Sequence, residues 1–159
     1  MSVDYCEKTA VFIGHSECYN LSRELVKKII IKHINIGVIN FLNGGQGEFD
    51  RLCAYCVYEL QKKYANIKNY IVIPYISFSI FDKKIFDEII FPDNFEKYYF
   101  KSAILERNKY MVENSSYAIC YINHSWGGAA KTFKLALKRD LKIYNFGSME
   151  QTDMRQCSL

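Results

Sequence analysis

Short apolar segments alternate with stretches of helical periodicity along most of this 159-residue chain. The apolar segments are predicted strands, because they are almost uniformly apolar and lack the polar alternation of a half-exposed strand; they lie at residues 9–14, 37–42, 70–75, 117–122 and 141–145. The predicted amphipathic helices cover residues 20–34, 48–64, 102–114 and 129–139. This alternation predicts an α/β fold: a doubly wound, mostly parallel, Rossmann-like sheet with helices on both faces.

Local signals set some of the predicted boundaries. Asn20 and Ser102 are polar residues of the type that caps a helix, so each is expected to begin the helix that follows it. The stretch 76–101 is dense in phenylalanine and tyrosine. Its only strand-like segment is the short apolar run at 89–91.

Composition excludes several classes of protein. With 24% charged and 16% aromatic residues the chain is not disordered, and its length suits one domain spanning 1–159 with a polar tail from about residue 147. No apolar run approaches the roughly 18 residues that a membrane span needs. Asp4 and Lys8 precede the first short apolar run, which is unlike a signal peptide. We therefore expect a soluble, cytoplasmic protein with no membrane partner.

Charge and cysteine content limit which partners, metals and cofactors are expected. The net charge of +4 comes from scattered lysines without an arginine-rich tract, so nucleic acid is not the expected partner. Of six cysteines only Cys53 and Cys56 have a suggestive spacing, and no second pair follows them. They share the apolar face of a predicted helix, so we interpret them as small buried hydrophobic residues. No metal and no cofactor is expected.

Three loops that follow predicted strands carry glycines and polar residues. Loops after parallel strands emerge at the same edge of a sheet, where α/β proteins bind their ligands. The candidate ligand-binding residues in these loops are Gly14, His15, Ser16, Asn43, Gly44, Gly45, Gln46, Asp50, Ser125, Trp126, Gly127 and Gly128.

The two glycine-rich turns, at 43–50 and 123–130, each lead into a predicted helix. Glycine lets the backbone approach a ligand closely, and a helix start presents free amide groups to an anion. Both turns are therefore predicted to hold phosphoryl oxygens. Neither is followed by the Gly-Lys-Ser/Thr of a nucleoside-triphosphate loop.

Other side chains have two interpretations each. His15 and His124 either contact phosphate or ribose or only close the ends of strands. Asp50, at a helix start, either contacts ribose or a base or only complements the helix dipole.

Two more positions carry alternatives of the same kind. Arg107 and Asn108 are expected either to reach the site as an anion clamp or to lie on a solvated helix face. Trp126 either stacks on a base or fills the core.

Four blocks together resemble the SLOG superfamily, the fold group of the DNA-processing protein DprA and the LOG phosphoribohydrolases. Within it, the chain looks most like small stand-alone bacterial proteins related to YpsA. The blocks are VFIGHS, FLNGGQGEFDRLC, ERNKYMVENSSYAICYI and HSWGGAAKTFKLALKRDLKIYN, in the family's order. Only 76–101 lacks a matching block.

The resemblance implies a Rossmann-like sheet that binds nucleotides or nucleotide-derived molecules at its glycine-rich loops. Some members are nucleotide N-glycosidases, and others are proposed sensors of signals such as ADP-ribose derivatives. His15 matches a common Gly-His pair, whereas Ser16 stands where many relatives have arginine. The positions that match ligand-facing motifs of the family are Gly14, Gly44, Gly45, Asp50, Arg107, Asn108, Gly127 and Gly128.

One departure from the family bears on activity. The phosphoribohydrolases carry a catalytic glutamate after the second glycine turn, but residues 127–139 of this chain contain no carboxylate. We therefore predict a non-catalytic binder of a nucleotide-derived small molecule, ADP-ribose-like or a cyclic nucleotide, that acts as a sensor or a sequestering protein.

Two alternatives stay open. One is a nucleotide N-glycosidase that cleaves the base from a nucleoside monophosphate with Glu48 or Glu113. The other is a structural protein that binds a partner through the aromatic stretch 78–100. A homodimer or higher homo-oligomer that buries part of this stretch is expected whichever function holds.

Overall fold

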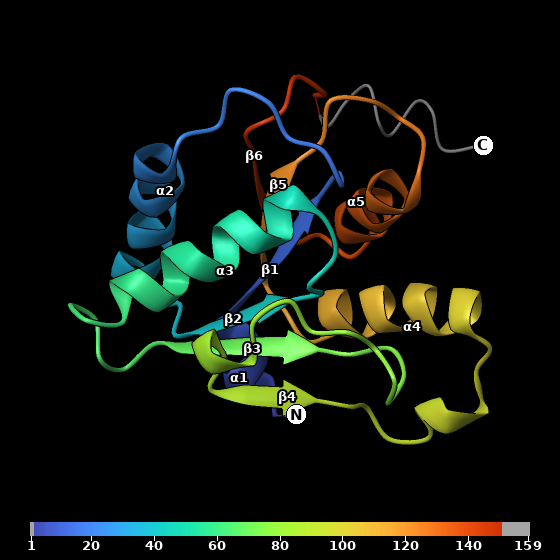
Figure 1. The fold of residues 1–159 in the computed structure, drawn as a ribbon. Helices are drawn as coiled ribbons and strands as arrows, with labels where there is room; N and C mark the ends of the chain where they lie inside the picture. The colour runs from blue at the N-terminus through green and yellow to red at the C-terminus, as the bar shows by residue number, and fades with distance from the viewer. Residues whose placement is uncertain (1, 151–159) are drawn as a thin grey trace.

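The computed structural model describes residues 2–150, which form a six-stranded sheet with helices on both faces (Figure 1). All five strand pairings are parallel, and the order across the sheet is β4-β3-β2-β1-β5-β6. The strands are β1 (Thr9–Gly14), β2 (Asn40–Asn43), β3 (Lys68–Val72), β4 (Glu88–Ile90), β5 (Tyr117–Tyr121) and β6 (Lys142–Asn145). The predicted doubly wound, Rossmann-like α/β fold is confirmed.

The helices divide between the two faces of the sheet. Packed against one another, α2 (Arg23–Asn35) and α3 (Glu48–Leu60) cover one face, and α4 (Phe100–Glu113) and α5 (Gly128–Lys138) cover the other. Three short helical elements complete the chain: α1 (Val3–Glu7), which was not predicted, η1 (Lys83–Ile85) and η2 (Phe95–Lys97).

The direction of strand order changes at β1. The chain places β2, β3 and β4 successively on one side of β1 and then returns to place β5 and β6 on the other side. Such a switch leaves a crevice beyond the carboxyl ends of the strands on either side of it, because their connections lead to opposite faces of the sheet. Any ligand site is therefore expected beyond the ends of β1, β2 and β5.

Several predicted boundaries were wrong by a few residues. The N-cap of α2 is Ser22, whose hydroxyl accepts the Leu25 amide at 3.2 Å, whereas Asn20 occupies the left-handed region with φ 57°. Ser102 does not begin α4, because Tyr99 is the N-cap and Ser102 lies inside the first turn. The second strand begins at Asn40 because residues 36–38 form the turn that ends α2.

The buried core is apolar on both sides of the sheet, and its cysteines behave as predicted. Cys53 and Cys56 are completely buried in the layer between α2, α3 and the sheet. Each strand that lies inside the sheet is buried along most of its length. The predicted polar tail falls largely on residues 151–159, which lie outside the described residues.

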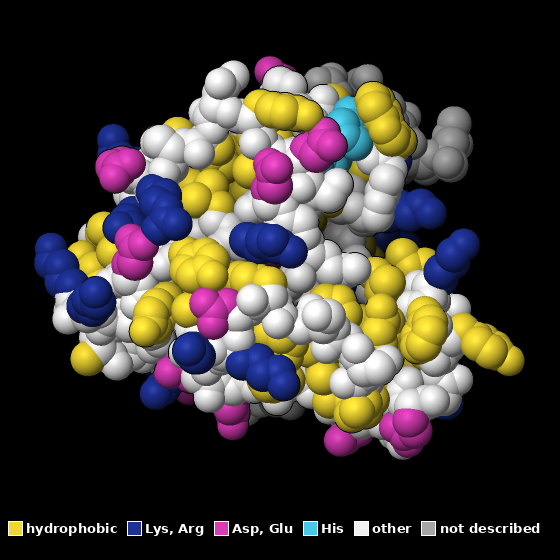
Figure 2. Space-filling view, in the orientation of Figure 1, with side chains coloured by type: hydrophobic (Ala, Val, Ile, Leu, Met, Phe, Trp, Pro, Cys, Tyr) yellow, Lys and Arg dark blue, Asp and Glu magenta, His cyan; other side chains and the backbone are white. Residues whose placement is uncertain are grey.

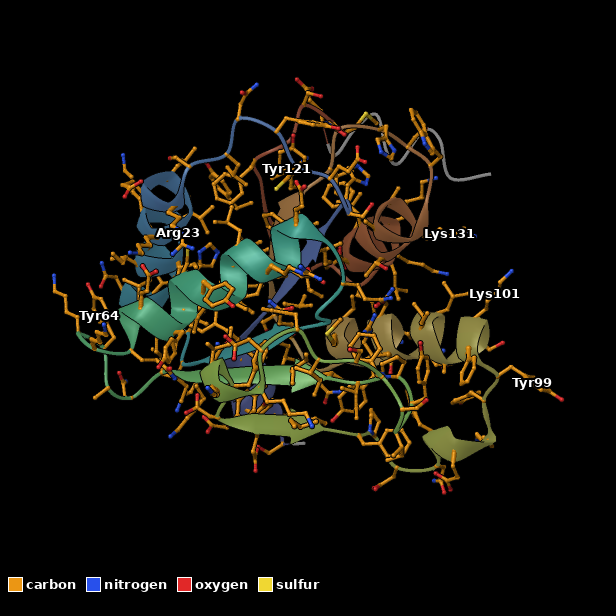
Figure 3. The ribbon with its side chains drawn as sticks, viewed as in Figure 1. Arg23, Tyr64, Tyr99, Lys101, Tyr121 and Lys131 are labelled. Carbon is orange, nitrogen blue, oxygen red and sulfur yellow. The ribbon has the colours of Figure 1, made fainter. Side chains whose placement is uncertain are left out.

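The aromatic stretch is divided between core and surface. Phe95 is buried, but Tyr99 and Phe100 are 88% and 63% exposed at the start of α4, where Tyr99 points away from the molecule (Figure 3). Figure 2 shows hydrophobic side chains gathered over this end of the molecule. The homo-oligomer expected from this stretch remains a prediction. Among residues 2–150, no helix is both long and apolar enough to cross a bilayer.

Candidate functional site

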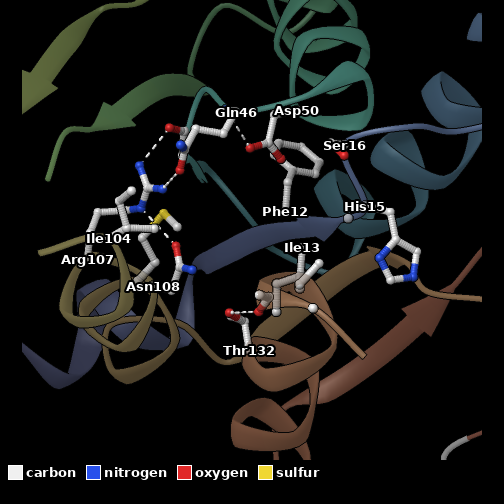
Figure 4. Close-up of a pocket in the computed structure, with 16 residues that line it drawn as sticks. Phe12, Ile13, His15, Ser16, Gln46, Asp50, Ile104, Arg107, Asn108 and Thr132 are labelled. Atoms are coloured by element: carbon white, nitrogen blue, oxygen red, sulfur yellow. Dashed lines mark hydrogen bonds between the residues drawn. The ribbon is translucent and has the colours of Figure 1, made fainter. Parts of the chain in front are cut away.

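A cavity of about 280 Å³ lies at the strand-order switch (Figure 4). Its walls come from the end of β1, the loop after β2, one side of α4 and the first turns of α5. Ten of the candidate ligand-binding residues line it: Gly14, His15, Ser16, Gly44, Gln46, Asp50, Arg107, Asn108, Gly127 and Gly128. Segments far apart in sequence therefore meet here.

Four of the candidate residues lie outside this lining. Asn43 is buried and supports the loop, since its amide donates to the Asp50 carbonyl at 2.7 Å and its oxygen accepts the Gly45 amide at 2.7 Å. Gly45 itself packs against the Ile71 side chain. Ser125 and Trp126 belong to the loop before α5, with Trp126 69% exposed. The alternative in which Trp126 fills the core is therefore wrong.

Arg107 is the most unusual side chain of the cavity, because it is 98% buried. Its Nε donates to Asn108 Oδ1 at 2.8 Å, and one Nη donates to the carbonyls of Gly44 (2.7 Å) and Val72 (3.1 Å). The other Nη donates to the side-chain oxygen of Gln46. The prediction of a solvated helix face is wrong for this residue, since its guanidinium is held inside the protein by four neutral acceptors.

Within residues 2–150 Arg107 forms no ion pair, although the Asp50 carboxyl is near enough to influence its charge. Burial lowers the pKa of Arg107 to about 10, so the group stays protonated at neutral pH. A buried cation with only neutral hydrogen-bond acceptors leaves positive potential at the cavity, which favours an anionic occupant.

Asp50 is the carboxyl group of the cavity lining. It lies in the first turn of α3, 7% exposed, and its Oδ2 accepts the Gln46 amide at 2.9 Å. Burial raises its pKa to about 7, against the opposing effects of that hydrogen bond and of the Arg107 charge. At neutral pH the carboxyl is therefore partly protonated and compensates the Arg107 charge only in part.

Asp50→Asn is expected to change how stability depends on pH. A carboxyl whose pKa is raised on folding stabilises the protein below its unfolded pKa of 3.8, and this contribution is lost as the pH rises through about 7. Relative to wild type, the variant should gain roughly 3 kcal/mol in unfolding free energy between about pH 5 and about pH 8. Urea unfolding at both pH values measures this. A difference that does not grow with pH would contradict the assignment.

The two helix starts have the same backbone conformation but different hydrogen bonding. Gly47, the N-cap of α3, has φ 92° and ψ 175°, and Gly127, the N-cap of α5, has φ 91° and ψ 174°. At α3 the first amide is occupied, because Glu48 N donates to Ser16 O at 2.8 Å, and in the turn before it Gln46 N donates to Asp50 Oδ2.

At α5 the first amides are open. Gly128 and Ala129 line the cavity, and their amides donate to no acceptor within residues 2–150. N-terminal amides of a helix point away from its first turn, as an anion site requires. That both glycine turns hold phosphoryl oxygens remains a prediction: both turns line the cavity, but the first amide of α5 is free, whereas Ser16 accepts the first amide of α3.

The contrast between these two glycines is testable by substitution. A Cβ on Gly47 would lie 2.5 Å from the Ser16 Cα, whereas a Cβ on Gly127 would meet nothing within 4 Å. Both substitutions pay the strain of positive φ, about 1–2 kcal/mol, but only Gly47→Ala adds a backbone clash. Gly47→Ala should therefore lower the unfolding free energy by at least about 2 kcal/mol more than Gly127→Ala does. Equal losses in urea unfolding would contradict this.

His15 has a structural partner at the rim. Its Nε2 accepts the Asn123 amide at 3.2 Å, and its own amide donates to the Tyr121 carbonyl at 3.2 Å. Burial, with a smaller effect of His124, lowers the pKa of His15 to about 4. The ring is therefore neutral at physiological pH, and it joins the ends of β1 and β5 without supplying a positive charge.

Sequence reasoning missed several apolar lining residues and one hydroxyl. Ile104 and Met111 flank Arg107 at helical spacing, so the periodic face of α4 was the signal that could have found them. Thr132 lies one turn into α5, and its hydroxyl donates to the Gly128 carbonyl at 2.9 Å. The remaining unpredicted lining residues are Phe12, Ile13 and Ala129.

The two glutamates considered for catalysis lie away from the cavity. Glu48 accepts the Cys18 amide at 3.1 Å and does not line the cavity. Glu113 lies at the other end of α4, where it pairs with Arg139 at 2.6 Å and Lys109 at 4.0 Å. Neither side chain is placed to act on a ligand held between Arg107 and α5.

No family model matches the sequence, and no curated protein matches it. Solved structures do. DNA processing protein A from Helicobacter pylori, described for its single-stranded DNA binding mode, gives a TM-score of 0.64 at 13% identity over 93% of this chain and 68% of that one. The structural-genomics target TM1055 gives 0.57 at 15% identity over 86% of this chain and 72% of that one.

These two neighbours define the class of fold. At such low identity the likeness concerns the fold alone, and it agrees with the Rossmann-like α/β fold predicted from the sequence. The narrower resemblance to proteins related to YpsA remains a prediction.

Proposed function

We propose that this protein binds a phosphorylated, nucleotide-derived small molecule in the cavity between Arg107 and the start of α5, and that it does not cleave it. One observation carries this proposal. Free amides of Gly128 and Ala129 line the same cavity as a buried guanidinium that forms no ion pair with any carboxylate of residues 2–150. Both features favour an anion there, and phosphate suits helix starts.

The size of the cavity limits what lies inside it. Small-molecule sites in proteins begin at about 300 Å³, and this cavity has about 280 Å³. It suits one phosphate and its sugar. The base of a cyclic mononucleotide would extend past the rim, and an ADP-ribose-like molecule would extend further.

The small number of carboxyl groups at the cavity supports binding without cleavage. Hydrolysis of a glycosidic bond ordinarily uses a pair of carboxylates on either side of it. Among the described residues, Asp50 supplies the only carboxyl group of the cavity lining, and that carboxyl already accepts the Gln46 amide. A sensor or a sequestering protein is the role that follows, and a homo-oligomer remains the proposed assembly.

Calorimetry with a panel of ligands tests the proposal. AMP, ADP-ribose and cyclic AMP should give saturable heat, and adenosine, which lacks phosphate, should not. Chromatography of the mixtures should detect no free base. A single-stranded oligonucleotide belongs in the panel, because the DprA neighbour is described as binding single-stranded DNA. Heat from the oligonucleotide alone, or release of base, would overturn the proposal.

A further inference from the structure

Three aromatic rings form a continuous stack from the cavity wall to the protein surface. The rings of His15 and His124 lie 3.6 Å apart at 13°, and those of His124 and Trp126 lie 3.9 Å apart at 20°. We call these three residues the aromatic stack. His15 is part of the cavity lining, so the stack begins at the proposed ligand site.

The outer end of the stack is Trp126, the only tryptophan of the chain. Its inner face is covered by His124, and yet the residue is 69% exposed, so its opposite face is open. The histidine at the inner end is fixed by the hydrogen bond from Asn123 and by the edge-on ring of Tyr121 at 6.5 Å. The stack therefore holds a large flat apolar surface in place before any ligand arrives.

Trp126 lies just outside the cavity lining, in the loop that leads into α5. Trp126 and Gly128 are two residues apart, so their Cα atoms are separated by at most about 7.6 Å. One nucleoside monophosphate can span from the start of α5 to the indole ring. A flat π-system beside a phosphate site is the arrangement that proteins use to hold a base by stacking.

We propose that the open face of Trp126 stacks on the base of the nucleotide whose phosphate lies at the start of α5. The inference rests on the proposed function and names its ligand class, a nucleotide that carries an aromatic base. Stacking accepts every base, because each has a π-face. The site therefore distinguishes ligands with a base from ligands without one, and it does not select strongly among the bases.

Tryptophan fluorescence tests this directly, because Trp126 is the only source of the signal. AMP and ribose 5-phosphate are each titrated while fluorescence and heat are recorded. AMP should quench the fluorescence with the same midpoint as its heat and should bind about tenfold more tightly than ribose 5-phosphate. Ribose 5-phosphate should bind and leave the fluorescence unchanged.

Variants separate stacking from phosphate binding. Trp126→Ala should weaken AMP about tenfold and leave ribose 5-phosphate unchanged, and Trp126→Tyr should restore most of the lost affinity. Tyr99→Ala removes an even more exposed aromatic ring at the start of α4 and should change neither ligand (Figure 3).

The outcomes separate the two proposals. Equal affinity for AMP and ribose 5-phosphate, with unquenched fluorescence and no effect of Trp126→Ala, overturns the stacking inference and leaves the proposed function standing. Binding of neither ligand overturns the proposed function and the stacking inference with it.

Discussion

Gly128→Asp is expected to abolish nucleotide binding while the protein stays as stable as wild type. A Cβ at this position meets nothing within 4 Å, and the backbone does not need a positive φ. A carboxylate in the first turn of α5 even complements the helix dipole by about 0.3–1 kcal/mol. The same carboxylate occupies the place proposed for phosphate, where like charges repel by several kcal/mol, so affinity for AMP should fall at least about 100-fold.

Gly128→Ala is the matched control for this experiment. It adds the same Cβ into the same open space but brings no charge, so AMP should bind within a few fold of wild type in calorimetry. The comparison is sharper than an equivalent change at Gly45, where φ is 68° and a Cβ would lie 2.6 Å from Ile71. Undiminished AMP binding by Gly128→Asp would contradict the position assigned to the phosphate.

Arg107→Met should cost both stability and binding. The change leaves the Gly44 and Val72 carbonyls without their donor, and each unsatisfied buried group costs about 1–3 kcal/mol. The unfolding free energy should therefore fall by roughly 3–5 kcal/mol. Since the cavity also loses its positive charge, AMP should bind at least about 100-fold more weakly to the fraction that circular dichroism shows to be folded.

Two further variants isolate the reason for this loss. Arg107→Lys keeps the charge but not the planar set of donors. Compared with Arg107→Met, it should therefore recover part of the affinity for AMP but little of the unfolding free energy. Lys109→Met removes a neighbouring cation on the exposed side of α4 and should change neither property by more than a small amount. If Arg107→Met binds AMP as wild type does, the guanidinium is only a structural element.

The fold was predictable because its signals are local and repeated. Nearly uniform apolar runs separated by amphipathic stretches leave few arrangements other than a covered parallel sheet. The helix boundaries were less predictable, because Asn20 and Ser22 are both good capping residues and only the backbone decides between them. In the same way, Ser102 is not the N-cap that was predicted, because α4 begins earlier, at Phe100.

The site was predictable as a meeting of loops but not as a set of hydrogen bonds. Loops after parallel strands share one edge, and that rule was enough to bring Gly44 and Gly128 to one cavity. Two turns with matching backbones looked alike in sequence. Only the folded structure shows that Ser16 and Asp50 accept the amides of Glu48 and Gln46, and that Arg107 lies inside the protein.

The most direct test of the central claim is an amide NMR titration with AMP and with inorganic phosphate. Both ligands should shift the amides of Gly128 and Ala129 more than any other signals, because a phosphate would accept hydrogen bonds from these free donors. A second hollow, at the amino ends of β5 and β6, serves as the comparison site; its lining includes Ser115, Ser116, Arg139 and Lys142. Shifts confined to that hollow, or none at Gly128 and Ala129 at saturating AMP, would contradict the account.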